Sequence, residues 1–218
     1  MRQVPPDVFA GLAPVAPATG VIAIARRPGV DREALLGASR EAPIVLLDDP
    51  ASLGNLGAVV RVAAAAGAAG VVTTGRHDPW HPAALRGSAG LHFAVPVARI
   101  DTLPACGRPL IALDPEGEPL HPHALPPGAI LAFGSERRGL DRRILERAER
   151  RVAIPMRAGV SSLNLATAVS VVLYTLRPLH AAPTLTGRHR RATFCEGRRG
   201  RGITPERRTA GFFPWGTE

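Results

Sequence analysis

The sequence predicts an α/β protein with a mainly parallel sheet flanked by helices, and two observations lead to this prediction. Continuous apolar runs of strand length recur along the chain, which is typical of strands buried on both faces of a parallel sheet. Segments with helical spacing of apolar residues separate these runs, so that strands and helices alternate. The chain of 218 residues, with 45% hydrophobic and 21% charged residues, has the composition of a soluble globular protein with one substantial core.

The elements follow from this pattern in chain order. Strands are expected at 21–25 (VIAIA), 43–49 (PIVLLDD), 71–74 (VVTT), 95–100 (VPVARI), 110–114 (LIALD), 130–133 (ILAF) and 152–155 (VAIP). Helices are expected at 31–40, at 55–67 with Gly67 as its end, at 81–90, at 141–150 and from Leu163 to Leu176.

One domain is expected, over residues 20–180. Residues 1–19 are rich in Pro and Ala without periodicity and indicate a linker-like arm. Residues 181–218 hold eight Arg against three Glu, a net charge of +5, and are predicted to be a disordered basic tail. No apolar run is long enough to span a bilayer and the start resembles no signal peptide, so a cytoplasmic location is expected.

The charge of the chain indicates a polyanionic partner. The formal net charge is +9 and the pI about 11.4, and all 27 basic residues are arginine, whose guanidinium matches phosphate in a bidentate way. The arginine tail is equally well explained as a solvated segment, and the absence of lysine as compositional bias. Cys106 and Cys195 lack the spacing of a zinc site, and His77, His81, His121 and His123 lie among prolines, so no metal is expected.

Three polar segments follow predicted strands, at 48–61, 133–140 and 154–164. In open parallel sheets ligands bind beyond the carboxyl ends of the strands, so these segments are expected to meet there. Each has a simpler explanation as well. Ser161, Ser162 and Asn164 are good helix caps, Arg61 fits a surface residue that extends toward solvent, and Glu136 fits an ordinary surface turn.

Together the three segments resemble the three motifs of the SpoU family of RNA ribose 2′-O-methyltransferases, within the SPOUT superfamily. GNLGAVVRVAAAAGAAGVV resembles the first motif, LAFGSERRGL the second and IPMRAGVSSLNLATAVSVVLY the third. Their order and spacing also agree, so the resemblance covers roughly residues 20–176. It implies a C-terminal trefoil knot, which ordinary rules of chain topology do not suggest.

The resemblance also implies the chemistry and the residues of the site. The cofactor would be S-adenosylmethionine, held near Leu113, Gly134, Ile154 and Leu163, and the substrate a ribose 2′-hydroxyl of rRNA or tRNA. The implied catalytic residues are Arg61, Asn55, Glu136, Ser162 and Asn164, within a homodimer whose cleft combines both subunits. A SPOUT-fold module that binds RNA or cofactor without turnover is the alternative, and a nucleotide-binding oxidoreductase is disfavoured because the GxGxxG fingerprint is missing.

Overall fold

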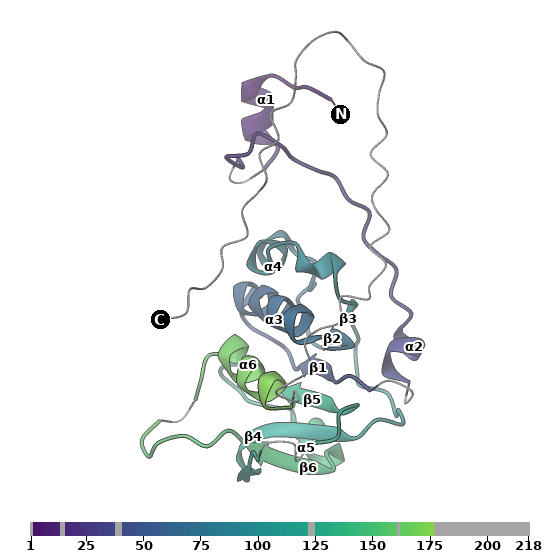
Figure 1. The fold of residues 1–218 in the computed structure, drawn as a ribbon, viewed down its shortest axis with the longest axis vertical. Helices are drawn as coiled ribbons and strands as arrows, with labels where there is room; N and C mark the ends of the chain where they lie inside the picture. The colour runs from purple at the N-terminus through teal and green to yellow at the C-terminus, as the bar shows by residue number, and fades with distance from the viewer. Residues whose placement is uncertain (1, 14–15, 38–40, 122–124, 161, 177–218) are drawn as a thin grey trace, which may run out of the picture. The chain divides into compact units, whose positions relative to one another are not determined.

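The computed structural model describes residues 2–13, 16–37, 41–121, 125–160 and 162–176. Ser161 and the predicted tail at 181–218 lie outside these residues. A six-stranded parallel sheet forms the centre, in the order β3-β2-β1-β5-β4-β6 (Figure 1). The strands are β1 (Ile44–Leu47), β2 (Gly70–Thr73), β3 (Val97–Arg99), β4 (Leu110–Pro119), β5 (Ile130–Phe133) and β6 (Arg150–Ala153). The predicted fold class, α/β with a mainly parallel sheet, is confirmed.

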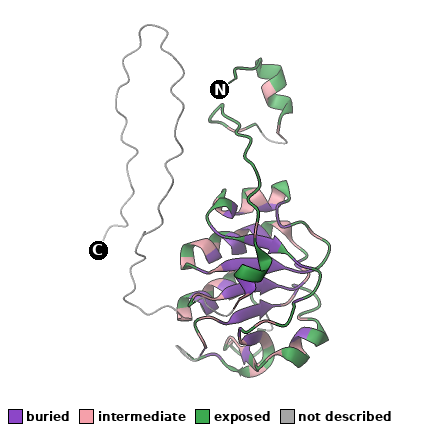
Figure 2. Ribbon diagram, turned by 90° about the vertical axis from the view of Figure 1, so that its right-hand side faces the viewer, coloured by how far each residue is buried: buried purple, intermediate pink, exposed green. Residues whose placement is uncertain are grey.

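Helices cover both faces of this sheet. The helices are α1 (Pro6–Gly11), α2 (Arg32–Leu36), α3 (Leu53–Ala66), α4 (Pro82–Gly87), α5 (Arg142–Arg147) and α6 (Leu165–Leu176), with a 3₁₀ turn at Leu91–Phe93. Along β1 the side chains alternate, with Val45 and Leu47 packing in the core under α3, α4 and α6. Ile44 and Leu46 face the opposite core, which α2 and α5 complete. Strands buried on both faces explain the continuous apolar runs of the sequence (Figure 2).

Helix α3 is the element that carries the first polar segment. The hydroxyl of Ser52 caps it by accepting from the Asn55 N–H at 3.2 Å, and Gly67 ends it in the left-handed region at φ 73°. A Cβ added at Gly57 would lie 2.2 Å from the carbonyl oxygen of Ala84, so only glycine allows α3 and α4 to approach this closely. The predicted helix at 55–67 is therefore confirmed, and it starts two residues earlier.

The strand predicted at 21–25 is wrong. These residues have no regular secondary structure and are exposed, and Ile24 has a relative solvent-accessible area of 101%. Among the described residues the segment joins neither edge of the sheet, which are β3 and β6. Apolar composition does not by itself make a strand, because the backbone groups also need a hydrogen-bonding neighbour. The arm predicted at 1–19 includes the short helix α1, which buries none of its residues.

The remaining boundaries differ by a few residues. Strand β5 matches its prediction at 130–133, whereas β4 extends five residues beyond the predicted end at Asp114. Within the described parts of the chain, no helix combines the length and the apolar character needed to cross a membrane.

Candidate active site

The three polar segments meet at the carboxyl edge of the sheet, and hydrogen bonds join them. The Nδ2 group of Asn55 in α3 donates to Oε1 of Glu136 at 2.8 Å, although the two residues are 81 positions apart. The Nδ2 group of Asn164 donates to Oδ1 of Asn55 at 3.1 Å. The Ala51 N–H donates to the second carboxylate oxygen of Glu136 at 3.2 Å. Asn164, Asn55 and Glu136 thus form one chain of hydrogen bonds, which we call the amide–carboxylate chain.

Asn164 is at the same time the cap of α6. Its Oδ1 accepts from the Ala166 N–H at 2.9 Å, which satisfies one of the free donors of the first turn. Its Nδ2 group remains available for Asn55. The capping and the site interpretations of this residue are therefore compatible, because its Oδ1 caps the helix and its Nδ2 contacts Asn55.

Glu136 is held as a carboxylate. Partial burial would raise its pKa, but hydrogen bonds from the Asn55 amide and from the backbone N–H groups of Glu136, Ala51 and Ser52 outweigh this effect. The net result is a lowered pKa, so the side chain is anionic at neutral pH. A fixed carboxylate of this kind orients the Asn55 amide.

The turn that presents Glu136 closes tightly behind β5. The backbone N–H groups of Ser135 and Gly139 each donate to the other's carbonyl oxygen at 3.0 Å. A Cβ added at Gly134 would lie 2.1 Å from the carbonyl carbon of Gly139 and 2.3 Å from the Leu140 nitrogen. Because these are backbone atoms that have little room to move, only glycine fits here.

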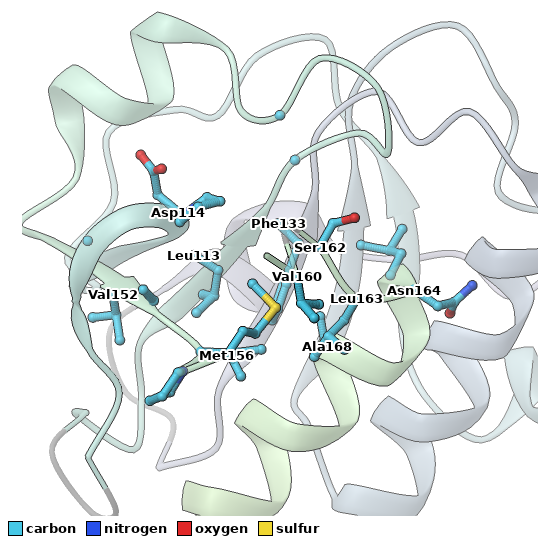
Figure 3. A pocket seen from close by; sticks show the side chains of 18 of the residues that line it. Leu113, Asp114, Phe133, Val152, Met156, Val160, Ser162, Leu163, Asn164 and Ala168 are labelled. Carbon is cyan, nitrogen blue, oxygen red and sulfur yellow. The ribbon is translucent and has the colours of Figure 1, made fainter. Parts of the chain in front are cut away.

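Beside the amide–carboxylate chain lies a cavity of about 960 Å³. Its lining includes all four residues predicted to bind the cofactor, namely Leu113, Gly134, Ile154 and Leu163, and three of the predicted catalytic residues, namely Glu136, Ser162 and Asn164. Figure 3 shows the apolar side chains of Leu113, Met156 and Leu163 gathered in it, while the amide of Asn164 points away from them. The cavity is therefore an apolar space with a polar rim.

A local departure of β4 from regular pairing helps to form this cavity. Both Leu113 and Glu118 of β4 are paired with Val152 of β6, so the intervening residues 114–117 leave the ladder. Of these, Asp114, Pro115 and Gly117 line the cavity. The sequence prediction missed these residues and Met156, and the Pro and Gly of the DPEGEP run were the available signal for the bulge.

Arg61 lies elsewhere. It is exposed on α3, and it lines neither the 960 Å³ cavity nor a smaller hollow of about 530 Å³ that Glu136 also lines. Asn55, Ser135 and Glu136 contribute to that smaller hollow, and so do Arg76, Arg137 and Arg138. A single chain thus brings together four of the five predicted catalytic residues and leaves Arg61 apart.

No group of three or more His, Cys, Asp or Glu residues that could hold a metal ion occurs in the described ranges. Cys195 lies outside them.

Comparison with known proteins identifies relatives of this chain. The 23S rRNA (uridine(2479)-2'-O)-methyltransferase of Streptomyces viridochromogenes is 31% identical over 174 residues, which are 71% of this chain and 58% of that protein. The 23S rRNA (guanosine(2553)-2'-O)-methyltransferase RlmP of Bacillus subtilis is 34% identical over 146 residues, 62% of this chain and 57% of that protein. The chain thus spans little more than half the length of these relatives.

A solved structure with the same fold is that of the SpoU methyltransferase AviRb from Streptomyces viridochromogenes in complex with AdoMet. It superposes with a TM-score of 0.61 at 28% identity, covering 68% of this chain and 61% of that one. The sequence model of the SpoU rRNA Methylase family matches residues 42–174, which contain all three polar segments. The chain therefore belongs to the SpoU rRNA methylase family.

Proposed function

We propose that this protein transfers a methyl group from S-adenosylmethionine to a ribose 2′-hydroxyl of RNA, with rRNA favoured over tRNA. The observation that carries the proposal is the amide–carboxylate chain at the rim of the 960 Å³ cavity, where one residue from each motif meets the others. Family membership and the two relatives named as 23S rRNA 2'-O-methyltransferases support both the reaction and the preference for rRNA.

The cavity fits the proposed cofactor. Its volume lies in the usual range of small-molecule sites, and its apolar walls suit an adenine ring and a methionine chain. Backbone groups near Leu113, Gly134, Ile154 and Leu163, which all line the cavity, would hold the polar groups of the cofactor. When bound, S-adenosylmethionine supplies a methyl group on a sulfonium, which is a good leaving group.

The chain's own residues then have to align the ribose oxygen and stabilise it as its proton leaves. Alignment alone can supply several of the roughly 7–11 kcal/mol available from proximity. In this proposal Glu136 stays anionic and fixes Asn55, which together with Asn164 and Ser162 positions the groups at the rim. Arg61 stabilises the developing oxyanion by its positive charge. Its guanidinium stays protonated at neutral pH, so it has no free base form that could accept the proton of the hydroxyl.

We further propose that the working unit is a homodimer. Arg61 lies outside the cavity of its own chain, and a second subunit would give it a cavity to face. Exposed apolar residues on α6, including Tyr174 at 51%, support an interface at this helix. With a dimer interface at this helix, residues of both subunits would line the cleft.

The trefoil knot of the SPOUT fold is also part of the proposal. Strand β6 lies at one edge of the sheet, whereas α6 packs in the core with α3, so the chain returns from that edge between β6 and α6. Residues on both sides of this return line the same cavity as the tight turn at 134–139, which supports a knot at this end of the domain. Residues 20–180 would form the methyltransferase domain, the tail at 181–218 would contact RNA by charge, and the enzyme would act in the cytoplasm.

The test of the reaction is transfer of labelled methyl from S-adenosylmethionine to total rRNA and, separately, to total tRNA from a strain that lacks this gene. Label in rRNA supports the proposal, and label confined to tRNA overturns the preference for rRNA. No transfer to either pool, together with calorimetric binding of S-adenosylmethionine, favours the second candidate, a module that binds RNA or cofactor without turnover.

A further inference from the structure

A second basic hollow lies further along the same edge of the sheet. We infer that it binds the phosphodiester backbone of the RNA next to the reacting nucleotide, an inference that rests on the proposed function. The hollow has a volume of about 600 Å³. Four arginines line it, from three segments: Arg27 and Arg32 in the segment that leads into α2, Arg76 after β2 and Arg99 at the end of β3.

The charge of the hollow is strongly positive. Asp78 is the acidic residue in its lining, so the four arginines leave a net charge of +3 there. The neutral part of the lining consists of Pro, Gly, Val and Ala, without an aromatic ring on which a base would stack. Guanidinium groups without a stacking surface match phosphates better than they match bases.

Two of the four arginines are held in place by neighbours. The Nη1 group of Arg27 lies 3.2 Å from the Oδ2 atom of Asp78, and the guanidinium lies 5.2 Å from the ring centroid of Trp80. Arg99 donates to the Gly75 carbonyl oxygen at 3.2 Å and lies 3.9 Å from Asp101. Each of these groups keeps further donors, since a guanidinium has five N–H groups.

Arg32 and Arg76 have no ion pair with any residue that the structure describes. Both side chains are exposed. They are therefore available to bind an anion without first breaking an internal ion pair. An arginine that had to break such a pair would bind the anion less favourably.

The hollow is connected to the candidate active site through shared residues. Arg76 lines both this hollow and the 530 Å³ hollow that contains Asn55. Glu136 and Arg137 in turn line both the 530 Å³ hollow and the 960 Å³ cavity. The three spaces thus follow the carboxyl edge from β6 and β4, past β5 and β1, to β2 and β3.

This sequence of spaces defines a path for an RNA strand. A ribose placed at the amide–carboxylate chain carries phosphates on both sides, and one side leads past Arg76 into the arginine hollow. Contacts of this kind fix the register of the RNA on the protein and carry no base information directly. The inference extends the proposed site by one substrate-positioning surface.

The test compares two double variants of the full-length protein. In the first, Arg32→Gln and Arg99→Gln remove two charges from the hollow. In the second, Arg86→Gln and Arg142→Gln remove two charges from exposed arginines that line none of the three spaces. Unchanged calorimetric affinity for S-adenosylmethionine in both variants serves as the check that the fold is intact.

Binding of a short fluorescein-labelled RNA hairpin is measured by anisotropy at several KCl concentrations. Each lost phosphate contact is expected to reduce the slope of log K against log salt by about 0.7–0.9, so the first variant should lose up to about 1.8 units of slope. The control variant should keep the slope of the unchanged protein. Equal slopes in all three proteins, or equal losses in both variants, would overturn the inference.

A second arm separates the backbone of RNA from a free phosphate ion. Binding of inorganic phosphate alone is measured by calorimetry at constant ionic strength. If phosphate binds the unchanged protein and not the first variant, while the salt slope for the hairpin is equal in all three proteins, the hollow selects isolated phosphate and the inference fails. Because the readout is binding, a failure of methyl transfer to any RNA would refute the proposed function while the salt slope still decides the role of the hollow.

Discussion

The Nδ2 group of Asn55 lies 2.8 Å from Oε1 of Glu136, and this contact joins the first helix after β1 to the turn after β5. The same asparagine accepts from Asn164 at 3.1 Å, so one amide connects all three polar segments. Its position between two partners makes it the residue on which the geometry of the rim depends.

Replacing Asn55 with Ala should raise the pKa of Glu136. The hydrogen bond from the Asn55 amide is the largest of the effects that lower this pKa, and without it the opposing effect of burial gains relative weight. Titration of the Glu136 carboxyl by NMR should give a midpoint below that of an exposed glutamate in the unchanged protein and a higher midpoint in the variant. An unchanged midpoint would mean that the backbone donors alone hold the carboxylate.

The lowered pKa also fixes the direction of a pH effect on stability. A carboxylate that is more acidic in the folded than in the unfolded state contributes to the free energy of unfolding above the ordinary glutamate pKa. This contribution disappears as the pH falls through the lowered pKa. Chemical unfolding at a series of acidic pH values should therefore show a smaller acid-dependent loss of stability for Glu136→Gln than for the unchanged protein, and parallel curves would contradict the assignment.

Asn164 has two functions that separate variants can distinguish. Asn164→Ala removes both the cap and the contact to Asn55, and the lost cap should cost about 1 kcal/mol in the free energy of unfolding. Asn164→Ser keeps an oxygen that can cap α6 but loses the amide donor. The Ser variant should therefore be nearly as stable as the unchanged protein while its methyl transfer is reduced, measured by denaturant unfolding and by initial rates. Full activity in the Ser variant would leave Asn164 with the capping role alone.

Arg61→Ala should remove turnover and leave affinity for S-adenosylmethionine nearly unchanged. The side chain lines no part of the cavity in its own chain, and loss of a group that stabilises an oxyanion typically costs on the order of 100-fold or more in rate. Arg142→Ala, an equally charged change at an 89% exposed arginine, serves as the control. An Arg61→Ala enzyme as active as this control would overturn the role proposed for Arg61.

Gly134→Ala should destabilise the protein by roughly 1–3 kcal/mol or more, because the added carbon would collide with the backbone of Gly139 and Leu140. Gly54→Ala is the matched control, since a Cβ there meets only the Ser52 hydroxyl oxygen at 3.8 Å and the position is helical. The control should be neutral or slightly stabilising in denaturant unfolding. Equal stability of the two variants would show that the turn at 134–139 can open to admit a side chain.

The sequence predicts best those strands that are buried on both faces, because their apolar residues are visible directly in the sequence. ILAF at 130–133 is buried on both faces, so its apolar run predicts β5 residue for residue. VIAIA at 21–25 has a similar composition but lacks a neighbouring strand among the described residues, and its exposure was not predictable from composition. Pairing partners are a property of the whole chain, and a short window of sequence does not contain them.

The same distinction applies to the site. The meeting of the three polar segments followed from the rule that parallel strands end at one edge. The hydrogen-bond partners of Asn55 did not follow, and neither did the β4 bulge, because both depend on the register between distant strands. Arg76 and Arg99 were also missed, since an isolated arginine in a loop or at a strand end looks like any solvated residue until its neighbours are known.

The central claim is that the amide–carboxylate chain directs methylation to a ribose oxygen, and alkaline hydrolysis of rRNA labelled by the enzyme tests it most directly. A methyl group on the 2′-oxygen removes the nucleophile that cleaves the adjacent phosphodiester bond in alkali. The account predicts that the label appears in alkali-resistant dinucleotides and is lost when Asn55→Ala replaces the unchanged protein. Label released in mononucleotides would place the methyl group on a base and contradict the account.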